Sequence, residues 1–199
     1  RGNNRFTWLR GFRDINARAI VNSSFYYGPL WREHRNTMNE ILPDSDNVLL
    51  LRPIHAQHAI TVLPAVDPVI EAAGAQGVLV AQIFSIKHGA VGAFAQQAET
   101  QFAHYRAAGI REAGIMVSLD VPNNFPQLPV RTDGPYLVWL GIVENDQALQ
   151  SAFDPLEKAG RRFFIDIGLL RGLPELVIMD PTPRSRLRWY APQCSEDTV

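Results

Sequence analysis

The sequence predicts an α+β fold in which one strand–helix–strand pattern occurs twice. Two observations support this prediction. Trp8-Leu9 recurs as Trp139-Leu140, 131 positions later. NVLLLRP at 47–53 also resembles ELVIMDP at 175–181, 128 positions later. Because recurrence at a similar spacing indicates one structural unit used twice, we expect two related units in the chain.

The first half of the chain is expected to hold two helices between two strands. Alternating residues at 6–12 predict a strand, and Asp14 can cap the helix that follows. Gly28-Pro29 ends that helix and starts a second one over 30–41. The apolar run at 48–51 predicts a buried strand. The first helix should pack through one face, which carries Ala17, Ile20, Val21 and Ser24.

The second half predicts a longer series of elements. Strands are expected at 77–86, 113–121, 136–143 and 175–179, and helices at 90–108 and from Asn145 or Asp146 to Ala159. In chain order these elements are β-α-β-β-α-β, which is the ferredoxin-like unit. The predicted fold class is therefore α+β, with two ferredoxin-like (βαββαβ) units, of which the first is N-terminally incomplete.

The incomplete first unit leaves the predicted strand at 6–12 without a neighbour. A long unpaired strand is unfavourable because its backbone groups stay exposed. We therefore expect a strand, a helix and a strand to precede Arg1, or another chain to supply the pairing.

Composition indicates a globular protein. The chain has 199 residues, 46% of them hydrophobic and 20% charged, which suits one large domain or two small ones. Its net charge of -1 gives no electrostatic reason to expect nucleic acid or an anionic membrane as a partner. No apolar run approaches the roughly 18 residues of a membrane helix. The single cysteine, Cys194, fits a reducing compartment, so a cytoplasmic location is expected.

Several segments resemble the NIPSNAP family. FTWLRGFRD, FYYGPLWREHRN and DSDNVLLLRP carry the resemblance, and NNFPQLPVR, VWL and DPTPRS look like the second half of two-unit bacterial members. The resemblance covers most of the chain and is weakest at 54–76. It implies that 1–53 is the C-terminal half of a first unit, 54–76 a linker, 77–183 a complete second unit and 184–199 a tail. It also implies a place in the dimeric α+β barrel superfamily, where two such units pack sheet to sheet into a barrel.

The densest polar and aromatic chemistry lies in FYYGPLWREHRN. On a helix, Trp31, His34 and Arg35 fall on one side by the three-and-four spacing. His34 could move a proton near neutral pH and Arg35 could bind a carboxylate, so these two are the candidate catalytic residues. The alternative for this cluster is core packing and satisfied polar groups. The candidate ligand-binding residues are Tyr26, Tyr27, Trp31 and, from a proline-rich loop, Asn124 and Arg131.

No metal or cofactor is expected. His55 and His58 are three residues apart with no further His or Cys nearby, whereas zinc takes three or four close ligands. The acidic run at 44–47 is better explained as a turn than as a calcium loop. The spacing of Met38 and His34 is a weak basis for haem. A basic, aromatic tail could contact a partner or RNA, or lie solvated on the surface; it carries Arg184, Arg186, Arg188 and Trp189.

Two functional hypotheses follow. The first is a small-molecule-binding α+β barrel, with cofactor-independent enzymatic activity as one form of it, in which His34 is the acid–base group and Arg35 holds an anion. The second is a non-catalytic interaction protein, which the resemblance implies because eukaryotic relatives are described as mitochondrial adaptors. Sheet packing of the barrel type also predicts a homodimer or higher oligomer. An enclosed polar cavity beside His34 would favour the first hypothesis, and a broad exposed apolar surface the second.

Overall fold

The computed structural model describes residues 5–42, 46–158 and 165–190. The chain divides into two compact units. Unit 1 comprises 1–5, 52–117 and 134–199, and unit 2 comprises 6–51 and 118–133. Asp44 and Ser45 of the predicted turn, and Cys194, lie outside the described residues.

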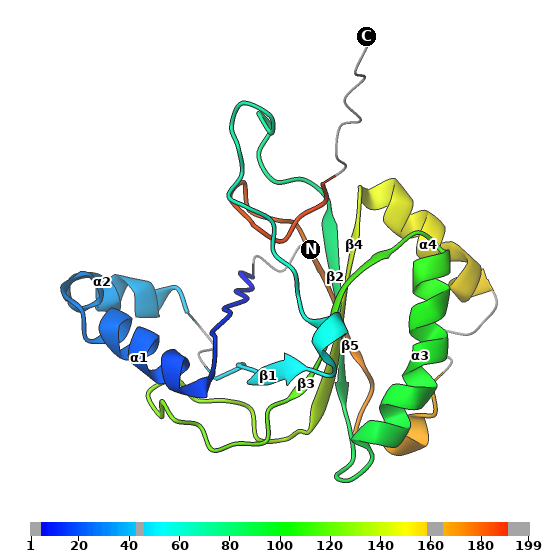
Figure 1. The fold of residues 1–199 in the computed structure, drawn as a ribbon, viewed down its shortest axis with the longest axis horizontal. Helices are drawn as coiled ribbons and strands as arrows, with labels where there is room; N and C mark the ends of the chain where they lie inside the picture. The colour runs from blue at the N-terminus through cyan, green and yellow to red at the C-terminus, as the bar shows by residue number, and fades with distance from the viewer. Residues whose placement is uncertain (1–4, 43–45, 159–164, 191–199) are drawn as a thin grey trace. The chain divides into compact units, whose positions relative to one another are not determined.

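Unit 1 is built around a five-stranded antiparallel sheet with the strand order β1-β3-β4-β2-β5 (Figure 1). The strands are β1 (Leu51–Pro53), β2 (Val78–Ser85), β3 (Arg111–Ser118), β4 (Tyr136–Val143) and β5 (Glu175–Met179). Next to β1, the Ile54 N–H donates to Ile115 O of β3 at 3.0 Å. A barrel requires its first and last strands to pair. Because β1 and β5 are the two ends of this order, the sheet is open, and the predicted packing of two sheets into a barrel stays a prediction.

The strands predicted for the second half are largely confirmed. β4 and β5 match their expected ranges, and β2 lies inside the expected 77–86. All eight residues of β4 are buried, which explains its continuous apolar sequence. β3 begins two residues before the predicted start at 113 and ends at Ser118.

Two helices, α3 (Val91–Ala107) and α4 (Asp146–Lys158), cover one face of this sheet (Figure 1). Asn145 caps α4 as predicted, because its Oδ1 accepts a hydrogen bond from the Ala148 N–H at 2.9 Å. α3 ends shortly before Gly109, whose φ of +91° is a conformation that glycine adopts readily. Both predicted helices are therefore present, and the second is described as far as Lys158.

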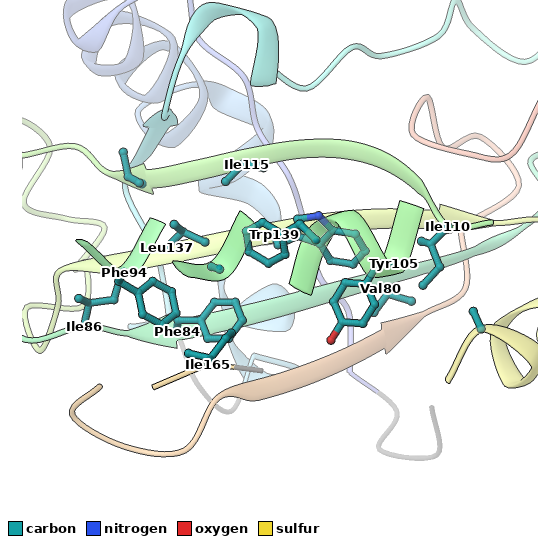
Figure 2. Close-up of a cluster of buried hydrophobic side chains, with 14 of the residues drawn as sticks. Val80, Phe84, Ile86, Phe94, Tyr105, Ile110, Ile115, Leu137, Trp139 and Ile165 are labelled. Carbon is teal, nitrogen blue, oxygen red and sulfur yellow. The ribbon is translucent and has the colours of Figure 1, made fainter. Parts of the chain in front are cut away.

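The core of unit 1 lies between α3 and the sheet, with Trp139 of β4 near its centre (Figure 2). Trp139 is fully buried and stacks on Phe102, with ring centroids 5.7 Å apart. Its Nε1 donates to Glu112 Oε2 at 3.1 Å, so the buried donor is satisfied. A Cβ atom at Gly141 would lie 2.4 Å from the Trp139 ring. The indole therefore requires glycine two positions further along β4.

Unit 2 contains α1 (Ile15–Tyr26), α2 (Pro29–Glu40) and the loop 118–133. Asp14 caps α1 as predicted, because its Oδ1 accepts a hydrogen bond from the Ala17 N–H at 2.7 Å. Asn145 caps α4 in the same way 131 positions later, the spacing that also separates Trp8 from Trp139. No helix in the described part of the chain is long and apolar enough to cross a membrane.

The predicted strand at 6–12 is not formed. A strand needs a hydrogen-bonded neighbour, and no backbone hydrogen bond joins 6–12 to another described residue. Trp8 is 59% exposed, and the Arg10 guanidinium lies over its ring at 4.6 Å. The predicted strand at 48–51 is also wrong in part, because this run is half-buried and the strand covers only 51–53.

The predicted apolar face of α1 is wrong as well. Ile20 and Val21 are 67% and 47% exposed, whereas Arg18 and Asn22 are buried. The Arg18 side chain donates to amide oxygens in the loop 118–133 of the same unit. Polar partners in that loop, rather than apolar contacts, therefore decide which face of α1 is covered.

Candidate functional site

The predicted aromatic residues lie together in unit 2. Tyr26 contacts Trp31 and Phe125, with ring centroids 4.9 and 5.8 Å apart. Tyr27 lies 6.3 Å from Phe125, and its hydroxyl accepts a hydrogen bond from Gln127 Nε2 at 2.7 Å. The structure thus brings the three predicted aromatic residues into one cluster, in which Tyr26 and Tyr27 pack on Phe125 and Trp31 packs on Tyr26.

The predicted catalytic residues are not enclosed. His34 and Arg35 are exposed on α2. The side chain of His34 is 55% exposed, and its Nε2 lies 3.9 Å from Glu33 Oε1. Neither residue lines either of the two cavities described below. A catalytic role for this pair stays a prediction.

Asn124, a predicted ligand residue, is engaged inside unit 2. Its Oδ1 accepts a hydrogen bond from Arg18 Nη1 at 3.0 Å, and its Nδ2 donates to Ile15 O at 2.6 Å. Arg18 Nη1 also donates to Asn123 Oδ1 at 2.9 Å. Arg18 is 4% exposed and has no carboxylate partner among the described residues, and this burial lowers its pKa. The sequence did not single out Arg18, because arginine in a helix usually faces solvent.

Arg131, the last predicted ligand residue, lines a cavity of about 400 Å³ in unit 2. Residues 46–47 and 129–133 form this cavity. The Arg131 guanidinium binds Asp133 at 3.0 Å and approaches Asn47 Oδ1 at 3.4 Å. A carboxylate from its own loop therefore balances the charge of Arg131, which weakens the case for an anion site in this cavity.

A pocket of about 300 Å³ in unit 1, which the sequence did not predict, offers a better candidate. It is formed by three segments far apart in the sequence, 57–63, 111–114 and 186–188, together with Ile142 of β4. We call it the unit 1 pocket. Its charged and polar lining residues include His58, Arg111, Glu112, Arg186 and Arg188.

Two glycines allow the walls of the unit 1 pocket to approach the sheet. A Cβ atom at Gly114 would lie 2.8 Å from Ile60 Cγ1 and 3.0 Å from His58 O. At Gly77, where φ is +104°, a Cβ atom would lie 2.6 Å from Trp189 Cβ. Larger residues at these positions would push both walls away from the sheet.

Arg188 fixes one of these walls. It is 3% exposed, and its Nε and Nη2 donate to the two carboxylate oxygens of Glu71 at 2.5 and 2.6 Å. Its Nη1 donates to Pro64 O at 3.0 Å and to Ser185 O at 3.2 Å. The hydrogen bonds from Arg188 are the largest cause of the lowered pKa of Glu71. We call this pair the Arg188–Glu71 clamp, because it joins 64–71 to 185–188.

The predicted tail at 184–199 is described as far as Tyr190, and this part packs within unit 1. The Trp189 N–H donates to Gln76 O at 2.9 Å, and Arg186 Nε donates to Leu63 O at 2.7 Å. The concentration of arginine and tryptophan in the sequence marked this segment as unusual. It did not reveal that residues 63–76 are its partners.

His58 is the polar group of the unit 1 pocket that lacks a partner. Its Nδ1 is buried and makes no hydrogen bond within the described part of the chain. The ring of His55 lies 5.8 Å away. Across 5–42, 46–158 and 165–190, no group of three His, Cys, Asp or Glu residues could hold a metal ion.

Comparison with known proteins adds no relative. No protein-family model, no curated protein and no solved structure matches the chain. The function must therefore be inferred from the fold and from the unit 1 pocket.

Proposed function

We propose that this protein binds a small molecule in the unit 1 pocket. The observation that supports this most is the pocket itself, a hollow of about 300 Å³ in which charged groups accompany the apolar side chains of Leu63, Ile142 and Leu187. Small-molecule sites are typically concave and largely apolar, with a few polar groups that orient the ligand. Because His34 and Arg35 are exposed on α2, the unit 1 pocket replaces them as the preferred site.

An enzymatic form of this proposal needs a group that moves a proton. His58 lines the pocket, and an imidazole changes its charge near neutral pH. His58 therefore takes the acid–base role that was predicted for His34. No cofactor is part of the proposal.

We further propose that 77–183 forms a ferredoxin-like unit. The chain order β2-α3-β3-β4-α4-β5 and the sheet order β5-β2-β4-β3 support this. The matching caps of α1 and α4 support an internal repeat. Relationship to the NIPSNAP family rests on the sequence resemblance in segments such as FTWLRGFRD.

A steric block of the pocket tests the binding proposal. Ala59 lines the pocket and is exposed, so Ala59→Trp should fill the hollow without disturbing the core. Ala56 is an exposed residue of the same segment that does not line the pocket, and Ala56→Trp is the matched control. A fragment library is screened by thermal shift, and hits are mapped by NMR.

Fragments that bind the wild type and Ala56→Trp but not Ala59→Trp are the expected result. The proposal fails if no fragment binds the wild type, or if every bound fragment binds Ala59→Trp equally well.

A second candidate function, self-association, is favoured by the exposed apolar residues of unit 2. Phe6 is 74% exposed, and Trp8, Leu9 and Ile20 are also exposed. Residues 6–12 have no backbone hydrogen bond to another described residue. A segment with strand-like sequence and unpaired backbone groups can pair with its own copy about a two-fold axis, because the two segments are then self-complementary. We therefore propose a second copy of this chain as the partner of 6–12.

Light scattering after size-exclusion chromatography tests the second candidate. The wild type should be a dimer that Trp8→Glu converts to a monomer, because the substitution places a charge in the paired segment. Leu173→Glu changes an apolar residue of unit 1 that is 84% exposed, and it should leave the dimer intact. A monomeric wild type, or equal dissociation by both variants, would overturn this candidate.

A further inference from the structure

We infer that the ligand of the unit 1 pocket carries an oxyanion, a carboxylate or a phosphate, which Arg111 and Arg186 bind. This inference rests on the proposed function and names the chemical class of its ligand. It follows from the charged groups that line the pocket, of which only two lack a partner of opposite charge among the residues that the structure describes.

Two of the charged lining residues already have a partner of opposite charge. Arg188 forms the clamp with Glu71 and uses its third nitrogen for two carbonyl oxygens. Glu112 accepts hydrogen bonds from Arg106 Nη1 at 2.6 Å and from Trp139 Nε1 at 3.1 Å. Arg106 also pairs with Glu99, so Glu99, Arg106 and Glu112 together carry one net negative charge, which is fewer than the two positive charges of Arg111 and Arg186.

Arg111 and Arg186 are different, because neither makes an ion pair with any described residue. Two cations therefore line one hollow without an ion-pair partner in the described part of the chain. A ligand with a negative charge would supply that partner, and arginine is the side chain best suited to hold carboxylate or phosphate oxygens.

The Arg111 guanidinium is held in place while most of its donors remain available. Its Nη1 donates to Tyr190 O at 3.2 Å, and its Nη2 donates to Arg188 O at 3.0 Å. The guanidinium also lies over the Trp189 ring, 4.6 Å from the ring centroid. Partial removal of water lowers the pKa of Arg111. A guanidinium has five N–H donors, so a ligand can still bind without moving the side chain.

Arg186 adds further donors. Arg186 uses its Nε for Leu63 O at 2.7 Å, and no hydrogen bond from its two Nη atoms joins another described residue. His58 also lines the hollow, but its Nδ1 is enclosed and makes no hydrogen bond within the described part of the chain. The apolar lining then suits the carbon body of a small organic acid or organic phosphate.

Matched acid and amide probes test the inference. Benzoate and benzamide have almost the same shape and differ in charge, and inorganic phosphate tests the second oxyanion. Binding to the wild type is followed by NMR titration of the backbone amides of 57–63 and 111–114. Benzoate or phosphate should bind at least about tenfold more tightly than benzamide, since hydrogen bonds to charged groups contribute about 1.5–3 kcal/mol.

Variants locate the effect. Arg111→Gln and Arg186→Gln should each weaken oxyanion binding about tenfold or more, and the charge-retaining Arg111→Lys should recover part of the loss. Arg184 is an exposed arginine of the same tail that does not line the pocket, so Arg184→Gln should bind as the wild type does. Circular dichroism confirms that each variant is folded.

The outcomes separate this inference from the proposed function. Equal binding of benzoate and benzamide, or equal weakening by Arg184→Gln, overturns the oxyanion inference. If fragments still bind the pocket in that case, the small-molecule proposal stands. If neither the probes nor any fragment binds, both are overturned.

Discussion

Tyr105 carries a hydroxyl into the core of unit 1, where two amide side chains surround it. Tyr105 is fully buried, and its hydroxyl accepts hydrogen bonds from Gln82 Nε2 at 2.7 Å and from Gln101 Nε2. Gln82 Oε1 is buried and has no partner in the described part of the chain. Burial is the largest cause of the raised pKa of Tyr105. The core therefore contains a polar network that is only partly satisfied.

Removal of the Tyr105 hydroxyl should therefore lower the free energy of unfolding by more than the loss of one hydrogen bond. Tyr105→Phe removes the oxygen to which two buried N–H groups donate, and we expect a loss of about 2 kcal/mol in the free energy of unfolding. Gln82→Met keeps the length of the side chain and removes the unpartnered Gln82 Oε1. It should therefore leave the free energy of unfolding almost unchanged. Urea unfolding measures both variants. A greater loss in Gln82→Met than in Tyr105→Phe would contradict this account.

The raised pKa of Tyr105 also predicts alkaline sensitivity. Because the folded state keeps this phenol neutral, its contribution to stability is complete below its ordinary pKa of 10.0 and is lost as the pH rises above that value. The stability of the wild type should fall more steeply above pH 10 than that of Tyr105→Phe. Parallel slopes in a series of urea titrations would rule this out.

Single residues of α1 show where sequence patterns mislead. The three-and-four spacing selects Ile20 and Val21 as the buried face, yet Arg18 and Asn22 are buried instead. Hydrophobicity identifies a face but does not tell whether the chain offers an apolar surface to cover it. The decisive partner, Asn123, lies 105 positions away from Arg18 and could not be read from local sequence.

The Arg188–Glu71 clamp joins two irregular segments, and its contribution to stability should depend on pH. The pKa of Glu71 is lowered from its ordinary value of 4.5, chiefly by the hydrogen bonds from Arg188. The contribution of the clamp is therefore present above pH 4.5 and is lost as the pH falls below that value through the folded-state pKa. We expect the midpoint temperature of thermal unfolding to decrease as the pH is lowered below 4.5.

Glu71→Gln should lower the midpoint temperature of unfolding at neutral pH. It should also make this temperature decrease less as the pH is lowered below 4.5. Glu144 is an exposed carboxylate outside the clamp, and Glu144→Gln should keep the wild-type profile. Differential scanning calorimetry across this pH range makes the comparison. If the two variants show the same acid profile, the clamp is not the source of the acid response.

Strands were predictable where burial decides the sequence. β4 is buried along its whole length, and its apolar run located it to the residue. The segment 6–12 has a similar pattern around Trp8, but it forms no strand, because no described strand pairs with it. Arg10 also stands at the repeat position of Gly141, and its guanidinium lies over Trp8 where the second copy leaves room for the indole.

The unit 1 pocket could not be predicted, because it depends on three segments that meet only in the folded chain. The sequence indicated His58 as part of a pair with His55, and Arg186 as part of a basic tail. Neither pattern links the two residues to each other. Their shared surroundings depend on the close approach at Gly114 and on the clamp. Local sequence predicts helices, strands and helix caps well, but it predicts contacts between residues more than a hundred positions apart poorly.

The two units differ greatly in the apolar side chains they bury. The buried hydrophobic residues of unit 1 include all the core cluster around Trp139, whereas among the described residues of unit 2 only Phe125 belongs to this class. Because burial of apolar surface is the main favourable term in folding, unit 2 should be the less stable part of the molecule.

Hydrogen exchange should show this difference directly. The amides of β2 and β4 should exchange most slowly, and those of α1 and α2 at least about tenfold faster. The measurement is made on the dilute protein, because pairing of 6–12 with a second copy would protect unit 2. Slower exchange in α1 than in β4 would refute the difference in stability.

The pairing of Arg18 with Asn123 and Asn124 has a consequence for how the gene can be divided. The N-terminal stretch 6–51 and the β3–β4 connection 118–133 form one unit although they are separate in sequence. A gene fragment that begins at codon 52 would keep most of the sheet, yet it would leave Phe125 without Tyr26 and both asparagines without their guanidinium. The natural boundary is therefore not a single cut, and isolating the sheet unit requires the β3–β4 connection to be shortened as well.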